Sequence, residues 1–241
     1  MNEFMPSSTE FPPEKEFSSV TDCPVDSPEL DLETELTPYF SSMEDEGIAS
    51  IERTDEYIDE REYGLQETID AAKEIFTKEV ITDWKNKSSS EKKEIAQRYA
   101  EAVAEALGVK SGKVYFIPWP PNERGKNNGD GNLYLNYDMI RESKNVIDLI
   151  DTIAHETRHS FQMAAVANPA RFGISPEVAK EWEYGFRHYH TYGATQYDPW
   201  GYSYNPVEID ARYFGESVVR GLTQDIIAGL KDGETLMGTR V

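Results

Sequence analysis

Two of the four histidines in this chain lie four residues apart around a glutamate, in the segment His155-Glu156-Thr157-Arg158-His159. Residues four apart on a helix share one face, with Cβ atoms about 6 Å apart. Two imidazoles at that spacing can bind one Zn2+ ion through nitrogens at about 2.0–2.1 Å. Glu156 leans toward the open side of the metal, where it can take a proton from bound water and return it to a leaving amine. The HExxH pattern therefore predicts metal-assisted peptide hydrolysis.

A helix with two surface histidines beside a salt bridge is the bland alternative. The flanking residues argue against it, because Ile147, Ile150, Ile153 and Ala154 precede the pattern and Phe161 follows it. A polar pair at the end of a buried helix needs a partner to offset the cost of burial. The flanks therefore favour the metal site.

Two histidines and a water leave a tetrahedral zinc site one protein ligand short. His188 and His190 are candidates, but Glu208 is the better one, because a Glu in a first helical turn lies at the favourable dipole end of a rigid element. Asp210 lies about 200° round that helix from Glu208, so one metal ion cannot easily take both. Asp210 can instead pair with Arg158 and hold two helices together.

Other side chains could assist the reaction. Tyr202, Tyr204 and His190 are candidates for stabilising the oxyanion of a tetrahedral intermediate. Packing under a loop is the alternative for the aromatic segment 182–204 that contains them. Asp151, one turn before the first histidine, could orient that imidazole, or it could be a solvated carboxylate.

The elements that position these residues are mostly helices. Periodic apolar residues predict one amphipathic helix from about Gln66 to Trp84. A second helix starts at a capping box of Ser88 and Glu91 and ends before Gly108, where a C′ glycine belongs. Residues 113–117 and 132–137 are predicted as strands, and residues 120–131 between them as a polar loop.

Three further helices are predicted. One runs from about Ser143 to Ala167 and carries the HExxH pattern. The second starts at Ser175-Pro176, with Ser as N-cap and Pro in the first turn. The last starts at Asn205-Pro206 and runs to about Gly229. This order predicts an α+β fold, mostly helical with a small β-sheet.

The net charge of −21 is unevenly distributed. Residues 1–62 hold 19 acidic and 3 basic residues, with six prolines and few aliphatic side chains. Such a segment cannot bury enough apolar surface to offset its chain entropy, which predicts a disordered acidic leader. The predicted compact domain, residues 63–241, has a net charge of only −5. The acidity argues against a nucleic-acid binder and against docking on anionic membranes.

The single cysteine, Cys23, excludes an internal disulfide framework and a cysteine-based zinc site. The N-terminus has neither the basic nor the apolar region of a signal peptide, and no apolar helical stretch is long enough to span a bilayer. We therefore expect a soluble protein made in a reducing compartment. If it leaves the cell, it uses a route without a cleavable signal.

The order of two strands, then Ile150 to Gln162 (IDTIAHETRHSFQ), then Tyr204 to Glu216 (YNPVEIDARYFGE) resembles zincin-fold metallopeptidases. It is most similar to the zincin-like domains of bacterial polymorphic toxins and secreted effectors, which show an HExRHxxQ helix followed by a P-x-E-x-D-A-R helix. The resemblance covers roughly residues 110–225. It implies zinc on His155, His159 and Glu208, with Glu156 as general base.

The same resemblance implies a translocated bacterial effector or toxin that is made in the bacterial cytoplasm and cleaves a target-cell protein. A secretion chaperone or a cognate immunity protein would then be its partner. The third histidine of metzincins is absent, because Gln162 and Ala165 occupy the Gly and His positions of that longer pattern. The alternative is a non-proteolytic zinc-bearing binding module whose acidic leader engages a partner. The leader itself could be a secretion signal, an inhibitory pro-segment or an inert tail.

Overall fold

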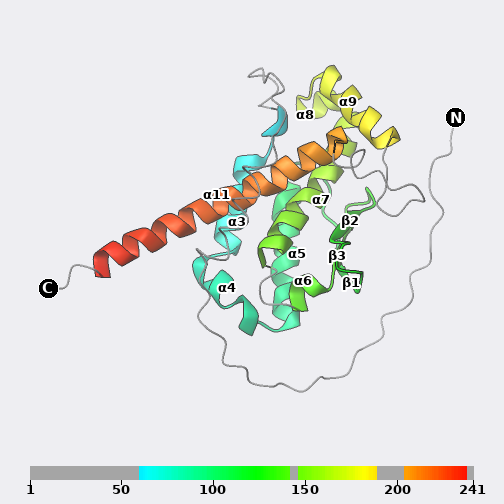
Figure 1. Cartoon of the computed structure of the whole chain (residues 1–241). Coiled ribbons are helices and arrows are strands. Elements are labelled where there is room, and N and C mark those ends of the chain that lie inside the picture. Colours follow the sequence, from blue (N-terminus) through cyan, green and yellow to red (C-terminus); the bar gives the residue numbers. More distant parts are fainter. Residues whose placement is uncertain (1–59, 142–145, 189–203, 238–241) are drawn as a thin grey trace.

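One long helix, α7 (Val146–Ala167), carries the two histidines and lies at the centre of the fold (Figure 1). The structure is a computed structural model, and it describes residues 60–141, 146–188 and 204–237. Its apolar side chains, among them Leu149, Ile150, Ile153 and Phe161, are buried in the hydrophobic core. Helices α5 (Ser89–Ala106), α9 (Pro176–Arg187) and α11 (Pro206–Met237) pack around it. The other elements are α3 (Leu65–Ile75), α4 (Lys78–Thr82), the 3-10 helix η1 (Trp84–Asn86), β1 (Val114–Ile117), β2 (Gly125–Asn127), β3 (Leu133–Asn136), α6 (Asp138–Arg141) and α8 (Pro169–Phe172). The predicted α+β class, mostly helical with a small sheet, is confirmed.

The single helix predicted from Gln66 to Trp84 is wrong. The chain leaves α3 at Ile75, and the Thr77 side chain then accepts a hydrogen bond from the Val80 amide as the N-cap of α4. A threonine hydroxyl that caps a new helix competes with continuation of the old one. The apolar residues on either side of the break, including Phe76 and Trp84, are still buried together. The apolar pattern therefore identified the buried residues correctly, although the backbone is not one continuous helix.

Helix α5 follows its predicted signals. Ser88 and Glu91 form the reciprocal capping box, and Gly108 follows the helix with a φ of 63°. A left-handed residue at that position closes the helix end, and glycine adopts it without a steric penalty.

The sheet contains one strand that sequence patterning did not predict. Its order is β1-β3-β2, with β1 parallel and β2 antiparallel to β3. Strands β1 and β3 were expected, but β2 lies in the segment predicted as a polar loop, and that prediction is wrong. Its three residues, Gly-Lys-Asn, have no strand propensity. Pairing with β3 and contacts with α7 hold it in place.

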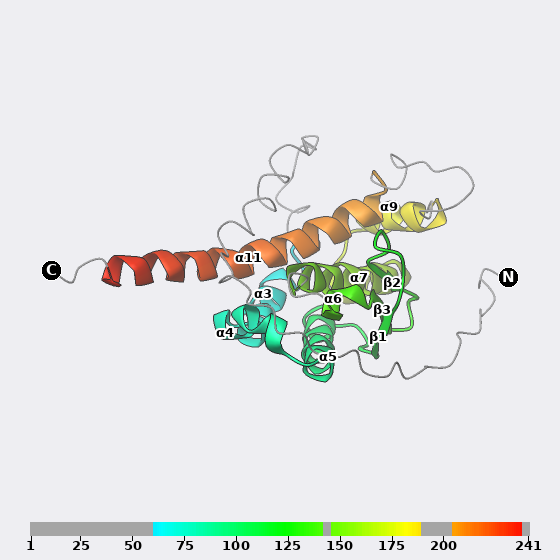
Figure 2. The same cartoon turned by 60° about the horizontal axis from the view of Figure 1, so that its bottom comes forward.

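The C-terminal helices begin where their caps were expected. The Ser175 hydroxyl accepts a hydrogen bond from Val178 at the start of α9, and the Asn205 side chain accepts one from Val207 at the start of α11. Helix α11 runs to Met237, beyond the predicted end near Gly229, and crosses both α7 and α3 before its C-terminal end extends past the other elements (Figure 2). None of the described helices is long and apolar enough to cross a membrane.

Residues 60–62 fall within the predicted leader but pack against the domain. The Glu60 side chain is buried, and its carboxylate accepts hydrogen bonds from the Ser175 amide and hydroxyl. The next residue after this segment, Tyr63, stacks on Phe161 of α7 with ring centroids 4.9 Å apart. The rest of the leader, residues 1–59, lies outside the described residues.

Candidate metal centre

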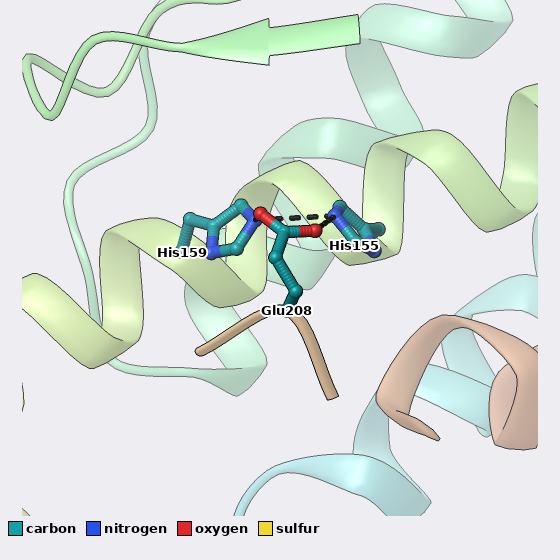
Figure 3. Close-up of side chains that lie close together, drawn as sticks. All are labelled: His155, His159 and Glu208. Atoms are coloured by element: carbon teal, nitrogen blue, oxygen red, sulfur yellow. Dashed lines mark hydrogen bonds and ion pairs between the residues drawn. The ribbon is translucent and has the colours of Figure 1, made fainter. Parts of the chain in front are cut away.

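The side chains of His155, His159 and Glu208 converge between α7 and α11 (Figure 3). The Nε2 atoms of the two histidines lie 3.1 Å apart. The Glu208 carboxylate places Oε2 at 3.4 Å from His155 Nε2 and Oε1 at 3.2 Å from His159 Nε2. Among the described residues, these three form the one group of His, Cys, Asp and Glu close enough to hold a metal ion.

These side chains are close enough together to bind one metal ion. Zinc bonds of about 2.0–2.1 Å at tetrahedral angles place neighbouring ligand atoms about 3.3–3.4 Å apart. The two imidazole nitrogens here are 3.1 Å apart, and a different oxygen of Glu208 faces each of them, at 3.2 Å from His159 and 3.4 Å from His155. Two imidazole nitrogens that face each other can share at most one hydrogen, and a carboxylate oxygen beside each adds another acceptor. A bound cation offsets this concentration of acceptors, so the donor set fits zinc.

Two helices hold the three candidate ligands in place. The histidines occupy positions i and i+4 on α7, and Glu208 lies in the first turn of α11. The side chain of Glu208 is 1% exposed, whereas that of His155 is 19% exposed. The group is therefore closed on the α11 side and reaches solvent at His155.

Gln162 on α7 contacts one of the candidate ligands, His159, directly. Gln162 Oε1 lies 2.8 Å from His159 Nδ1. The amide nitrogen of Gln162 donates to the Val207 carbonyl at 2.9 Å and to Asp210 Oδ2 at 2.7 Å. Sequence reasoning noticed Gln162 only as part of the HExRHxxQ pattern and gave it no role.

Asp210 pairs with Arg158, as one interpretation of the sequence predicted. Arg158 Nε donates to Asp210 Oδ2 at 2.8 Å, and Nη2 donates to Oδ1 at 3.1 Å. Both side chains are fully buried, and the pair links α7 to α11. Asp210 is not part of the candidate metal-binding group of His155, His159 and Glu208, so this geometry leaves Glu208 as the carboxylate that faces the histidines.

Glu156 lies beside the metal-binding group on the face of α7 that meets β2. A Cβ atom added to Gly125 of β2 would lie 3.0 Å from both Cγ and Oε1 of Glu156. Asn127 of β2 donates to the Glu156 backbone carbonyl at 2.5 Å and to the Ser160 hydroxyl at 2.7 Å. Sequence reasoning missed Gly125 and Asn127 because the segment was predicted as a loop.

The carboxylates and His159 perturb one another's protonation. Burial raises the pKa of Glu156, with an opposing effect from the two histidines. Burial also favours protonation of Glu208, but hydrogen bonds and charge from both histidines outweigh it and hold the Glu208 pKa well below its usual range. For His159, burial opposes the charged form, yet Glu208 and Glu156 raise its pKa to about 9.

The raised pKa of His159 predicts opposite pH dependences for folding and for metal binding. Without metal, the stabilising protonation of His159 is complete below about pH 6.5 and is lost as the pH rises to about 9. Zinc requires the neutral imidazole, so zinc affinity should rise over the same range. Chemical unfolding of the metal-free protein and zinc titrations measure the two trends. His159→Gln should remove the pH dependence of folding stability, whereas the exposed His188→Gln should change neither trend. Zinc affinity independent of pH in this range contradicts the prediction.

The other candidate residues have different outcomes. His188 is exposed, stacks on Tyr184 and hydrogen-bonds its backbone carbonyl through Nδ1, so it is not in the metal-binding group. His190 and Tyr202 lie outside the described residues. Tyr204 is 65% exposed, and its role in stabilising an oxyanion stays a prediction.

Asp151 lies on α7, one turn before His155. Its side chain packs against Gly215 of α11, and its Oδ2 atom is 4.0 Å from Arg124 Nη1. The proposed orientation of the His155 ring by Asp151 stays a prediction.

Comparisons of the chain with protein-family models, with curated proteins and with solved structures found no match.

Proposed function

We propose that this protein is a zinc-dependent endopeptidase of the zincin type. His155, His159 and Glu208 would hold the zinc ion, and Glu156 would act as general base. The observation that carries the proposal is that three side chains of types that bind zinc converge beside the buried carboxylate of Glu156. Glu156 lies on the same helix as the two histidines. Zinc bound to such a set polarises a substrate carbonyl and lowers the pKa of a water molecule.

The residues of the chain supply the proton transfers. Glu156 accepts the proton from the water that attacks the peptide carbonyl and donates it to the departing amine nitrogen. Its raised pKa suits this work, because a base is most effective when its pKa lies close to the working pH. His155, His159 and Glu208 would not exchange protons in this scheme, since they would hold the zinc ion.

The number of protein ligands favours catalysis over a structural role. Structural zinc sites use four protein ligands, whereas catalytic sites use three and keep one position open. The part of the chain that the structure describes provides three, and His155 faces solvent. A fourth ligand such as His190 would support the alternative, a non-proteolytic binding module.

Strand β2 offers a surface for an extended substrate. It is at the edge of the sheet, and its Gly125 lies against Glu156. An exposed strand edge binds an extended peptide through main-chain hydrogen bonds. This arrangement supports an endopeptidase, because the middle of a polypeptide could lie along β2 with a peptide bond close to Glu156.

The close contact at Gly125 gives a prediction for turnover. In Gly125→Ala, the new Cβ would lie 2.6 Å from Thr152 Cγ2 and 3.0 Å from Glu156, so β2 or Glu156 must shift. A misplacement of about 1 Å can reduce turnover about 100-fold, so we expect a loss of about 10- to 100-fold in kcat. Lys126→Ala, at the exposed neighbouring position of β2, is the control and should retain activity. Full activity of Gly125→Ala would show that this contact does not position Glu156.

The proposal is tested by searching for newly formed protein N-termini in a cell extract. The wild-type protein is compared with a double variant, His155→Ala with His159→Ala, and with the wild type after treatment with a zinc chelator. We expect a set of cleavage sites that only the untreated wild type produces and that added zinc restores. Identical sets of N-termini in all samples would refute the peptidase.

The resemblance to secreted effectors extends the proposal to localisation. The protein would be made in the bacterial cytoplasm and exported without a cleavable signal peptide, with a secretion chaperone or an immunity protein as partner. Because contacts with the domain include Glu60, a deletion of residues 1–58 preserves them. This deletion should abolish export if the leader is a secretion signal, raise activity if it is an inhibitory pro-segment, and change neither if it is an inert tail.

A further inference from the structure

A buried chain of hydrogen bonds connects the backbone of residues 60–63 to the metal-binding group. It runs through Arg158, Asp210 and Gln162 to His159 Nδ1, the nitrogen that faces away from the other ligands. We propose that Gln162 is a positioning residue that fixes the tautomer and orientation of His159, and that this chain of contacts sets the zinc affinity. The inference rests on the proposed zinc site.

The orientation of the Gln162 amide follows from its partners. Its Nε2 lies within hydrogen-bond distance of two acceptors, the Val207 carbonyl and Asp210 Oδ2. Because an amide NH2 group only donates and these partners only accept, Oε1 must point the other way, toward His159. A carbonyl oxygen accepts, so His159 Nδ1 must carry a hydrogen. The atom left for the metal is Nε2, which faces Glu208.

Asp210 keeps the Gln162 amide from turning over. A flipped amide would place its oxygen against the Asp210 carboxylate and its NH2 group against His159. The carboxylate is itself fixed, because Arg158 contacts both of its oxygens. The Arg158 guanidinium in turn lies 4.4 Å from the ring of Phe161 and 4.9 Å from that of Phe214. The Gln162 amide, the Asp210 carboxylate and the Arg158 guanidinium cannot move without breaking a buried hydrogen bond.

The segment 60–63 completes the surroundings of Arg158. Its Nη1 donates to the Tyr63 carbonyl at 3.1 Å, and its Nη2 donates to the carbonyls of Glu60 and Arg61, each at 3.2 Å. One carboxylate and three carbonyls thus satisfy a guanidinium that is fully buried. Residues that the sequence assigned to the leader are therefore part of the support of the metal centre.

The size of the expected effect comes from comparable sites. Groups that hydrogen-bond the outer nitrogen of a zinc-bound histidine typically contribute 10- to 100-fold to metal affinity. Gln162→Met retains the approximate length and volume of the side chain but removes the acceptor. We expect Gln162→Met to bind zinc about 10- to 100-fold more weakly than the wild type in competition with a chromophoric chelator.

The matched control is Gln66→Met. Gln66 also donates to an aspartate, Asp70, but on the exposed surface of α3. Its zinc affinity should equal that of the wild type. The visible spectrum of the cobalt-substituted protein provides a second readout that folding alone does not change, and it should differ from the wild type only in Gln162→Met. Equal zinc affinity of Gln162→Met and wild type would overturn the inference while leaving the zinc site intact.

A measurement on the unmodified protein covers the case in which Gln162→Met does not fold. Long-range 1H–15N correlation of the zinc-loaded wild type reports which nitrogen of His159 carries hydrogen. We expect a protonated, slowly exchanging Nδ1 and metal binding through Nε2. Zinc on Nδ1 would overturn the positioning role of Gln162. Absence of zinc from the wild type would instead refute the proposed function on which the inference rests.

Discussion

Glu156→Gln should abolish peptide hydrolysis and leave zinc bound. Glu156 is not one of the three converging ligands, so its replacement removes no metal bond. A glutamine amide has nearly the same shape but cannot take up and return a proton. General-base catalysis typically contributes about 100- to 10,000-fold to the rate, and kcat should fall by at least that factor. Turnover of an identified substrate and the zinc content of the same sample measure the two halves of the prediction.

The control for this variant is Asp148→Asn on the same helix. Asp148 lies about two turns before Glu156 and contacts Arg124 at 3.5 Å on a partly exposed face. The same carboxylate-to-amide change there should leave both turnover and zinc content close to those of the wild type. Undiminished turnover of Glu156→Gln would remove Glu156 from the mechanism, and loss of its zinc would show that Glu156 is a ligand.

Arg158→Met is expected to destabilise the fold more than any surface substitution. Arg158 and Asp210 are both 0% exposed, and the substitution leaves the Asp210 carboxylate buried without its cation. Removing one partner of a buried ion pair costs about 3–5 kcal/mol. Three backbone carbonyls of the segment 60–63 lose their donors at the same time. Urea unfolding of the metal-free protein measures the change in the free energy of unfolding.

An exposed pair in α9 provides the comparison. Arg187 contacts Glu183 one turn away, and both side chains are largely in solvent. Such pairs contribute about 0–1 kcal/mol, so Arg187→Met should have almost no effect. The double variant Arg158→Met with Asp210→Leu should recover part of the lost stability, because no charge remains buried. A cost below about 1 kcal/mol for Arg158→Met would show that Asp210 finds another partner or water.

Much of the candidate site follows from local sequence signals. The spacing of His155 and His159 places both on one face of any helix, and apolar flanks made the helix predictable. Asn205-Pro206 located the start of α11 and hence the first-turn position of Glu208. Angular separation on that helix argued against Asp210 and Glu208 binding the same metal ion and left a pair with Arg158 as one alternative, and the structure shows this pair.

The missed features depend on contacts between distant segments. Strand β2 exists because β3 and α7 hold it, and nothing in its own three residues indicates a strand. The amide of Gln162 is oriented by residues about 45 positions away in sequence, and Arg158 is enclosed by carbonyls almost 100 positions away. Composition placed residues 60–62 in the leader. The backbone carbonyls of Glu60 and Arg61, however, accept hydrogen bonds from Arg158, and composition gives no information about such bonds.

The helix break at Thr77 was missed for a different reason. Apolar periodicity reports which residues are buried, and Phe76 and Trp84 are indeed buried. It does not report whether the backbone between them is continuous. A single hydroxyl that caps α4 ends the helix without disturbing the pattern.

The central claim, one zinc ion held by His155, His159 and Glu208, is tested most directly by metal analysis combined with zinc X-ray absorption on the purified full chain. We predict one zinc per chain, bound by nitrogen and oxygen at about 2.0–2.1 Å with two imidazoles. The zinc should be lost in the variant that carries His155→Ala and His159→Ala. A wild-type protein without stoichiometric zinc, or a double variant that retains it, would contradict the account.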